Sequence, residues 1–197
     1  NIINRAGLKF DQYPYYNPAT GKAQIDNYLN CLNTKAQAGN VILMHAAAHN
    51  PTGIDPTQDD WKKIAEVMKK RNLVPYFDTA YQGFATGDLI KDAWPIRYFT
   101  EQGFSMLVSQ SYAKNMGMYG ERVGALHVVT QDKETASRVL SQLKMIIRAN
   151  YSSPPIHGAR IVERVLNDAA NLQQWKDELS AVAGRIIEMR SVLRGKL

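Results

Sequence analysis

The chain has 197 residues, 45% of them hydrophobic, which is typical of one globular domain and excludes an intrinsically disordered chain. Its single cysteine excludes a disulfide framework and a multi-cysteine zinc site, and no apolar run approaches the length of a membrane span. The net charge of +6 reflects a shortage of acidic residues, and without a cluster of basic and aromatic residues it favours an ordinary globular protein or a small anionic ligand over nucleic acid.

The first half of the chain alternates predicted helices with short apolar strands. Apolar residues at helical spacing predict a helix over residues 25–32, and the run Val41–Met44 predicts a buried strand. Thr57 is a typical N-cap, because acidic residues and then an apolar helical face follow it. Residues 73–77 predict a second strand, although Pro75 lacks the amide donor that a strand interior uses.

The second half begins with a short predicted helix that Pro95 opens. Residues 105–108 and 123–129 predict two more strands, and a long helix through residues 139–147 follows them. Residues 172–193 repeat apolar side chains every three or four positions. This pattern predicts a long helix that packs on the body of the protein or leads to another domain, with an isolated coiled coil as the alternative.

The alternation of strands and helices predicts an α/β fold, in which three layers are formed by a mostly parallel sheet with helices on both faces. In such sheets, ligands bind beyond the carboxyl ends of the strands. Six polar side chains follow the predicted strands or lie between them: Asn50, Asp78, Tyr81, Ser111, Lys114 and Arg122. Each one alone is more often a turn residue or a solvated side chain, but all six together favour a shared binding site.

Several of these side chains have chemistry that a cleft can use. A carboxylate directly after a buried strand, such as Asp78, is costly to bury unless a cation, a metal or a helix end is its partner. Lys114 near the top of a strand becomes a nucleophile toward carbonyl groups when its amine is neutral. Ser111 and Arg122 together can hold a phosphate group through a hydroxyl and a charged fork.

Five motifs in order along the chain carry a family resemblance. They are HNPTGIDPT at 49–57, FDTAYQGFA at 77–85, SQSYAKN at 109–115, GERVG at 120–124 and RANYSSPPIHG at 148–158. In these motifs the chain resembles the aspartate aminotransferase family, class I aminotransferases that depend on pyridoxal 5'-phosphate and have fold type I. The resemblance runs the whole length of the chain.

The resemblance implies a role for each residue around the cofactor ring. Lys114 matches the catalytic lysine that forms a Schiff base with pyridoxal phosphate and then shuttles a proton. Asp78 matches the acid that pairs with the pyridine nitrogen and keeps it protonated. Tyr81 and Asn50 match the two residues that hydrogen-bond the phenolic oxygen of the ring, and Asn50 also adjoins the substrate.

The remaining matches concern the phosphate and the substrate. Ser111 and Arg122 match phosphate ligands, and His45 matches a residue behind the acid, although a satisfied core histidine is an equally good interpretation. Arg148 matches the arginine that crosses a dimer interface and holds the distal carboxylate of a dicarboxylic substrate. Without the family context, Arg148 is an ordinary surface arginine. Ser152 is expected to approach the neighbouring subunit's site from the same stretch.

The chain also departs from the family. Tyr112 and Ser153 replace the Phe and Asn of many relatives. The family's phosphate loop, its ring-stacking aromatic residue, a tyrosine from the partner subunit and the arginine for the α-carboxylate have no counterpart here. The resemblance therefore implies a central fragment: most of the cofactor-binding large domain over 1–170 and the start of a long helix to a small domain over 171–197. We expect these residues alone to be inactive or nearly so.

The implied reaction passes an amino group between aspartate and 2-oxoglutarate in a homodimer that shares its sites across the interface. An aminotransferase of the same fold that accepts aromatic amino acids is the nearest alternative, since Arg148 does not exclude it. A non-catalytic module that only oligomerises and a nucleic-acid-binding protein are alternatives of other classes. The single Cys31 fits a reducing intracellular compartment, either the cytoplasm or the mitochondrion, and we expect no metal, membrane or nucleic-acid partner.

Overall fold

The computed structural model describes residues 2–197 and divides the chain into two compact units. The first unit takes in the chain up to Asn40 together with Pro56–Leu73. The second unit consists of Val41–Asp55 and Val74–Leu197 and contains the central sheet, so it also contains the candidate site residues.

The first unit is built from short elements and two amphipathic helices. Its elements are α1 (Ile2–Arg5), β1 (Tyr16–Asn17), β2 (Lys22–Ala23), α2 (Ile25–Thr34) and α3 (Gln58–Lys70). The N-cap prediction for α3 is confirmed, because Thr57 Oγ1 accepts a hydrogen bond from Asp60 N at 3.2 Å and the Asp60 carboxylate accepts one from Thr57 N at 3.0 Å. This reciprocal pair is a capping box. The predicted apolar face of α3 is buried: Trp61, Ile64, Ala65 and Met68.

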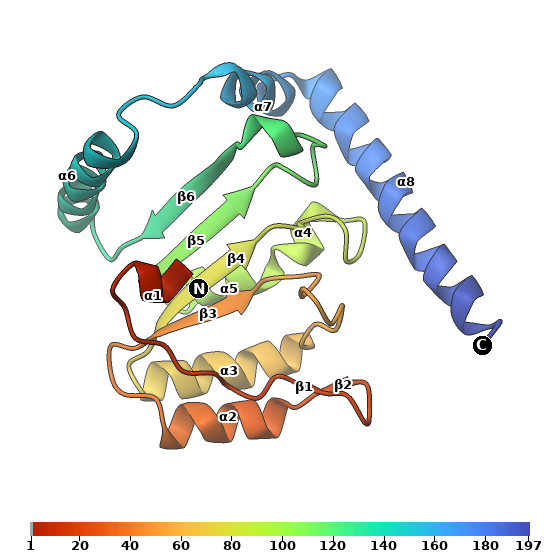
Figure 1. Cartoon of the computed structure of the whole chain (residues 1–197), viewed down its shortest axis with the longest axis horizontal. Coiled ribbons are helices and arrows are strands. Elements are labelled where there is room, and N and C mark those ends of the chain that lie inside the picture. The colour runs from red at the N-terminus through yellow and green to blue at the C-terminus, as the bar shows by residue number, and fades with distance from the viewer. Residues whose placement is uncertain (1) are drawn as a thin grey trace. The chain divides into compact units, whose positions relative to one another are not determined.

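The second unit is built around a four-stranded sheet (Figure 1). Its elements are β3 (Val41–His45), β4 (Val74–Thr79), α4 (Leu89–Asp92), α5 (Trp94–Glu101), β5 (Met106–Ser111), the 3-10 turn η1 (Tyr119–Glu121), β6 (Gly124–Val129), α6 (Lys133–Asn150), α7 (His157–Asn167) and α8 (Ala169–Arg194). The strand order is β3-β4-β5-β6, and β3, β4 and β5 are parallel. The predicted α/β class, a mostly parallel sheet flanked by helices, is confirmed.

Strand β6 runs antiparallel to β5. The connection between them carries only a single 3-10 turn, too little for the helical crossover that a parallel neighbour requires. Gly124 opens β6, because a Cβ at this position would lie 2.5 Å from the Gln110 carbonyl oxygen. Because it has no side chain, Gly124 allows the start of β6 to lie close against the end of β5.

The three parallel strands extend further than predicted. His45, Asp78 and Ser111 lie inside β3, β4 and β5, whereas the apolar runs predicted strands that stop before them. The reason is that backbone pairing with a neighbouring strand continues past the last apolar side chain, and pairing does not depend on hydrophobicity. Pro75 is accommodated as the second residue of β4, because pairing with β5 begins one residue later, at Tyr76.

The sheet has two different faces. The buried face carries apolar side chains that are almost inaccessible to solvent: Ile42, Met44, Phe77, Met106 and Val108. The Phe77 ring meets Phe99 of α5 edge-on, with 5.2 Å between the ring centroids. The open face carries the alternate residues, which are half-buried or exposed: Leu43, His45, Tyr76, Asp78, Leu107 and Ser109.

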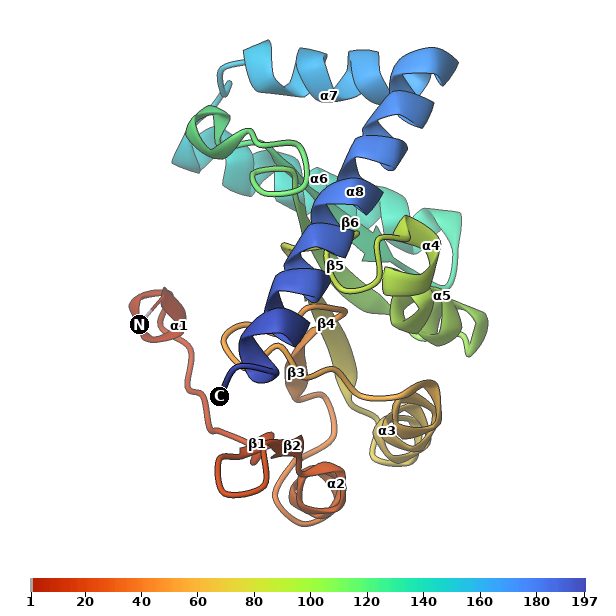
Figure 2. The same ribbon diagram turned by 90° about the vertical axis from the view of Figure 1, so that its right-hand side faces the viewer.

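The predicted long helix at the end of the chain is α8, which crosses the carboxyl ends of the parallel strands (Figure 2). Its first half is anchored on the loops that follow β4 and β5. Trp175 Nε1 donates a hydrogen bond to the Asn115 carbonyl oxygen at 2.7 Å, and Leu179 is buried. Further along, Val182 and Leu193 are 48% and 60% exposed. No helix within residues 2–197 is both long and apolar enough to cross a membrane.

Candidate active site

Three of the predicted residues meet where β3 and β4 end. Asp78 pairs in register with His45 on β3 and with Ser109 on β5. The side chains of His45, Asp78 and Ser109 therefore lie together on the open face of the sheet. His45 Nδ1 accepts a hydrogen bond from the Asn50 backbone N–H at 3.1 Å. Asn50 itself lies in the exposed turn after β3. The structure therefore brings the predicted residues Asn50, His45 and Asp78 together at the carboxyl ends of β3 and β4.

The Asp78 carboxylate is half-buried and is available to a ligand. Within the described residues, no hydrogen bond or ion pair engages this carboxylate. Ser109, its neighbour on β5, shares a hydrogen bond of 2.8 Å with the Tyr76 hydroxyl instead. A half-buried acid without a partner is unfavourable on its own and favours a bound cationic or N–H-bearing group.

Lys114 and Tyr81 come from different loops and lie together. Lys114 Nζ is 5.2 Å from the centroid of the Tyr81 ring, a distance at which the ring face attracts a cation. Lys114 belongs to the loop after β5, and Tyr81 belongs to the loop after β4. Both side chains are half-buried, so the amine is reachable from solvent but is held against an aromatic surface.

Hydrogen bonds of Gln82 connect the loop after β4 to β5 and to the loop that follows β5. Asn115 Nδ2 donates a hydrogen bond to the Gln82 carbonyl oxygen at 3.3 Å, and Gln110 Nε2 donates to Gln82 Oε1 at 2.8 Å. Gln82 follows Tyr81, and Asn115 follows Lys114, so the contacts restrain the two candidate residues through their immediate neighbours. Amide side chains in loops have no periodic pattern, and the sequence therefore carried no signal for this role.

Ser111 is the last residue of β5, and Arg122 lies in the connection just before β6. Ser111 pairs with Gly124, and Arg122 precedes that pair with a left-handed φ of 51°. The Ser111 hydroxyl accepts a hydrogen bond from Ala113 N at 3.2 Å, and Arg122 Nη1 donates one to the Tyr119 carbonyl oxygen at 2.9 Å. The guanidinium is exposed and keeps further N–H donors for an anion.

Arg148 and Ser152 form a separate pair. Arg148 lies in the last turn of α6, and its Nη1 donates a hydrogen bond to Ser152 Oγ at 2.5 Å. Helix α6 lies at the opposite end of the sheet from the arrowheads of β3, β4 and β5 (Figure 1). The structure does not bring this pair to the other candidates. The contribution of Arg148 and Ser152 to the site of a neighbouring subunit therefore stays a prediction.

The turn after β3 contains two further polar residues to which the sequence assigned no individual role. Asp55 accepts hydrogen bonds from Ala48 N at 2.7 Å and from His49 N at 2.9 Å, and so closes the turn that carries Asn50. Burial lowers the pKa of His49 below its usual 6.5, the nearby His45 lowers it further, and Asp55 opposes both effects. An acid a few residues after an Asn-Pro turn was the available signal for this closure.

The candidate residues together offer the functional groups that a phosphorylated pyridine aldehyde requires. These are an amine for an aldehyde (Lys114), a carboxylate for a protonated ring nitrogen (Asp78), a hydroxyl and an amide for an anionic ring oxygen (Tyr81 and Asn50), and a hydroxyl with a guanidinium for a phosphate (Ser111 and Arg122). The unpartnered Asp78 carboxylate fits such a group. Among residues 2–197, no three His, Cys, Asp or Glu side chains are grouped to hold a metal ion.

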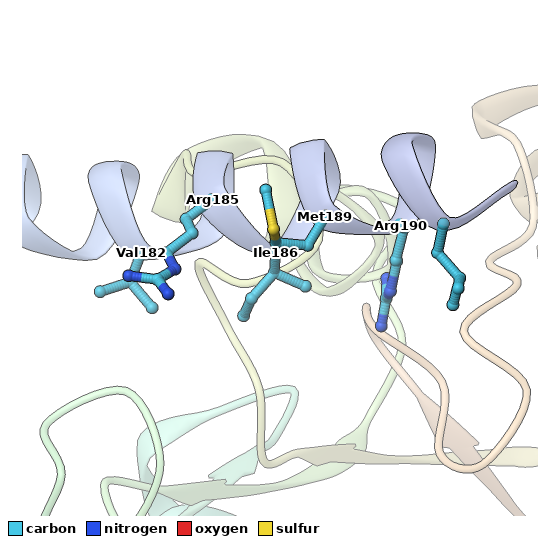
Figure 3. A pocket seen from close by; sticks show the side chains of 6 residues that line it. Val182, Arg185, Ile186, Met189 and Arg190 are labelled. Carbon is cyan, nitrogen blue, oxygen red and sulfur yellow. The ribbon is translucent and has the colours of Figure 1, made fainter. Parts of the chain in front are cut away.

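A separate groove lies along the second half of α8, and none of the predicted site residues lines it. Figure 3 shows side chains that line it, from Val182, Arg185, Ile186, Met189, Arg190 and Leu193. Arg190 reaches toward the turn after β3, where its Nη2 would lie 4.0 Å from a Cβ at Gly53. The groove therefore adjoins the Asn50 turn without including it.

Comparison with known proteins gives a consistent result. The model of the family "Aminotransferase class I and II" matches residues 1–197. The mitochondrial aspartate aminotransferase of Gallus gallus is 50% identical over an alignment that covers 100% of this chain and 46% of the relative. The cytoplasmic aspartate aminotransferase of Oryza sativa is also 50% identical, over 98% of this chain and 47% of the relative. The chain spans about half the length of the curated relatives it matches.

Solved structures extend the similarity to the fold. A mitochondrial aspartate aminotransferase from Trypanosoma brucei has 46% identity and a TM-score of 0.95, covering 98% of this chain and 51% of that one. An aromatic-amino-acid aminotransferase from Burkholderia pseudomallei, covalently bound to pyridoxal phosphate, has 42% identity and a TM-score of 0.94, with 96% and 47% covered. The chain therefore belongs to the class I and II aminotransferases.

Proposed function

We propose that the protein is a transaminase that moves an amino group between aspartate and 2-oxoglutarate, with pyridoxal 5'-phosphate as its cofactor. The observation that carries this proposal is the proximity of Lys114 to Tyr81, beside the carboxyl end of β4 where Asp78 lies. Lys114 Nζ is 5.2 Å from the centroid of the Tyr81 ring. Family membership and the 50% identity to aspartate aminotransferases support the same activity.

When bound, the cofactor supplies a ring that accepts electrons from the Cα of the substrate. Lys114 Nζ would bind its aldehyde carbon and afterwards take the proton from the substrate's Cα as a general base. The position of Lys114 suits both tasks, because its amine is half-buried and its backbone is restrained through Asn115 and Gln82.

The groups around Lys114 would orient the ring. The Asp78 carboxylate would hold a proton on the pyridine nitrogen through a charge-assisted hydrogen bond. Tyr81 and Asn50 would donate hydrogen bonds to the ring oxygen, and the Asn50 amide would also adjoin the substrate. His45 lies beside Asp78 in the sheet and accepts the Asn50 backbone N–H, so it would hold both residues in place.

Two arginines would bind the two kinds of anion. Arg122 with Ser111 would hold the phosphate, and Arg148 would hold the distal carboxylate of aspartate or 2-oxoglutarate. Because α6 lies away from the strand ends, Arg148 and Ser152 would serve the site of a second subunit. The proposed protein is therefore a homodimer whose sites are shared.

The proposal also concerns domain organisation and compartment. Residues 1–170 would belong to the cofactor-binding domain, and residues 171–197, which form most of α8, would lead to a second domain. The names of the relatives include a mitochondrial and a cytoplasmic form. On that basis we place this protein inside the cell, in one of those two compartments.

Substitution of Lys114 tests the proposal most directly. Borohydride reduction of the full-length protein with pyridoxal phosphate, followed by peptide mapping, should label Lys114 in the wild type. Lys114→Ala should lose this label and at least about 99% of aspartate turnover, because a general base alone contributes about 10² to 10⁴ in rate. Lys144→Ala, which removes an exposed lysine from α6, is the matched control and should change neither result.

Two results would contradict the proposal. One is diffuse labelling of surface lysines, which would favour a non-catalytic module that only oligomerises. The other is unchanged turnover in Lys114→Ala. Binding of nucleic acid through the positive charge is checked separately, since it predicts retention of DNA on a filter that weakens steeply with salt.

A second candidate substrate class is supported by a specific observation. The solved aromatic-amino-acid aminotransferase from Burkholderia pseudomallei is 42% identical to this chain with a TM-score of 0.94, nearly as similar as the aspartate enzymes. The ratio of kcat/KM for aspartate to that for phenylalanine separates the candidates. We expect this ratio to exceed about 100, because Arg148 would gain a charge-assisted contact only from a dicarboxylate.

A further inference from the structure

Asp92, at the end of α4, is a buried carboxylate that the proposed chemistry does not use. It is 3% exposed, and both of its oxygens accept hydrogen bonds. Oδ2 accepts from Gly83 N at 2.7 Å and from Ala85 N at 3.1 Å, and Oδ1 accepts from the Thr86 hydroxyl at 2.6 Å. All three donors belong to the loop after β4, so one side chain of α4 holds the loop that carries Tyr81.

The loop has little freedom to find another path. Gly83 has a φ of +96°, and a Cβ at this position would lie 2.3 Å from Leu179 Cδ2 of α8. On the other side, the Gln82 side chain donates to the Leu89 carbonyl oxygen at 2.9 Å and accepts from Gln110. The Gly83 and Ala85 amides point at Asp92 and would be left unpaired in this conformation without its carboxylate.

Burial of a carboxylate carries a large desolvation penalty, which only well-placed hydrogen bonds offset. Charge-assisted hydrogen bonds are roughly twice as strong as neutral ones, and their donors have fixed directions that apolar contacts lack. Asp92 therefore fixes the loop conformation more tightly than apolar packing would. The nearest residue that benefits is Tyr81, whose ring lies 5.2 Å from Lys114 Nζ.

We infer that Asp92 is a positioning residue that holds the loop after β4 so that Tyr81 stays against Lys114. The inference rests on the proposed function only for the consequence, which is the alignment of the Tyr81 hydroxyl with the ring oxygen of the cofactor. The restraint on the loop itself is a property of the chain, so the two parts have separate tests.

The first test is amide hydrogen exchange in the cofactor-free, full-length protein. Asp92→Ala should raise exchange in the peptide covering residues 81–87 by at least about tenfold, the factor for losing one hydrogen bond to a charged group. Exchange in β3 should be unchanged. Asp88→Ala is the matched control: Asp88 caps the same helix through the Ile90 and Lys91 amides at 2.8 Å and 3.1 Å, and its loss should leave residues 81–85 protected.

Asp92→Asn is the conservative variant. Its side-chain oxygen can still accept both loop amides, and its amide can donate to Thr86, so exchange should rise less than in Asp92→Ala. If Asp92→Ala does not fold, this variant decides: faster exchange confined to 81–87 supports the inference. Unchanged exchange there, or an equal rise in every peptide, overturns it, because then Asp92 acts on nothing local or on the whole fold.

The second test uses the absorbance of the bound cofactor as a function of pH. A hydrogen bond from Tyr81 to the ring oxygen favours the anionic form, so Tyr81→Phe should raise the pH midpoint of the absorbance change. Asp92→Ala should raise it in the same direction by up to about one pH unit. In the double variant the two shifts should not add, because Asp92 acts through Tyr81.

The outcomes separate this inference from the proposed function. A wild-type protein that takes no label at Lys114 overturns the proposed function, while the exchange experiment still decides whether Asp92 restrains the loop. A protein that binds the cofactor at Lys114 but shows fully additive shifts, or no shift in Asp92→Ala, overturns the positioning role and leaves the proposed function standing.

Discussion

The two faces of the central sheet differ in what they contribute. On the buried face, apolar side chains pack against one another and against α5, and they determine whether the chain folds. On the open face, the same strands present His45, Asp78 and Ser109, which are half-buried and polar. Successive residues of a strand point to opposite faces, so one strand serves both purposes.

Strand β4 shows this division most clearly. Phe77 is completely buried, and its neighbour Asp78 faces the other way with no partner among the described residues. Adjacent residues on opposite faces therefore carry the packing of the core and the proposed chemistry. Substitutions on the two faces should therefore have separable effects, which the following predictions test from the largest to the smallest.

Phe77→Ala should lower the free energy of unfolding by about 3–5 kcal/mol, because it removes a fully buried ring and leaves a cavity beside Phe99. Urea denaturation followed by circular dichroism measures the loss. Leu43→Ala, on the open face of the same sheet, is the control and should cost about 1 kcal/mol or less. Equal losses for the two variants would remove the distinction between the faces.

Asp78→Asn should have the opposite profile. The free energy of unfolding should change by less than about 0.5 kcal/mol, because no hydrogen bond within residues 2–197 depends on this carboxylate. The kcat of aspartate transamination should fall at least about hundredfold, the size typical of removing one aligned electrostatic partner. Steady-state kinetics and urea denaturation on the same preparation check both parts, and a stability loss that matches the activity loss would contradict the assignment.

The smallest effect concerns His49, in the turn that follows β3. Burial lowers the pKa of His49, so the unfolded chain binds a proton more tightly than the folded one. The contribution of His49 to stability is complete above its usual value of 6.5 and is lost as the pH falls through the lowered folded-state pKa.

Between about pH 7.5 and about pH 5.5, the wild-type Tm should therefore fall more than that of His49→Gln, which cannot titrate. Thermal unfolding at a series of pH values measures the difference. His127→Gln, on the exposed side of β6, removes a ring elsewhere and should keep the wild-type slope. Parallel slopes for the wild type and His49→Gln would contradict this reasoning.

Much of the fold could be predicted from the pattern of residues alone. The apolar spacing and the Thr57 N-cap predicted α3, and the apolar runs predicted the four strands of the central sheet. These features are local, since they depend on periodicity and on residues within a few positions of each other. The predicted strands stopped too early because backbone pairing, which apolar periodicity does not report, extends to His45, Asp78 and Ser111.

The sequence also predicted that the candidate site residues lie near the carboxyl ends of the strands, although Asp78 and Ser111 proved to lie inside β4 and β5. The sequence determined which groups are present: an amine, an acid, a phenol and two arginines. It did not determine that Lys114 would meet Tyr81, because their distance depends on strand register and on two loops that each could adopt many conformations.

Tertiary structure alone decided how those loops are held. Asp92 accepts from three donors, Asn115 and Gln82 join the loops, and Leu179 of α8 lies where a side chain at Gly83 would be. These contacts join residues without any shared periodicity, across segments far apart in the chain. The sequence thus determined the chemistry and the class of fold, and long-range packing and hydrogen bonding decided the geometry in which that chemistry is presented.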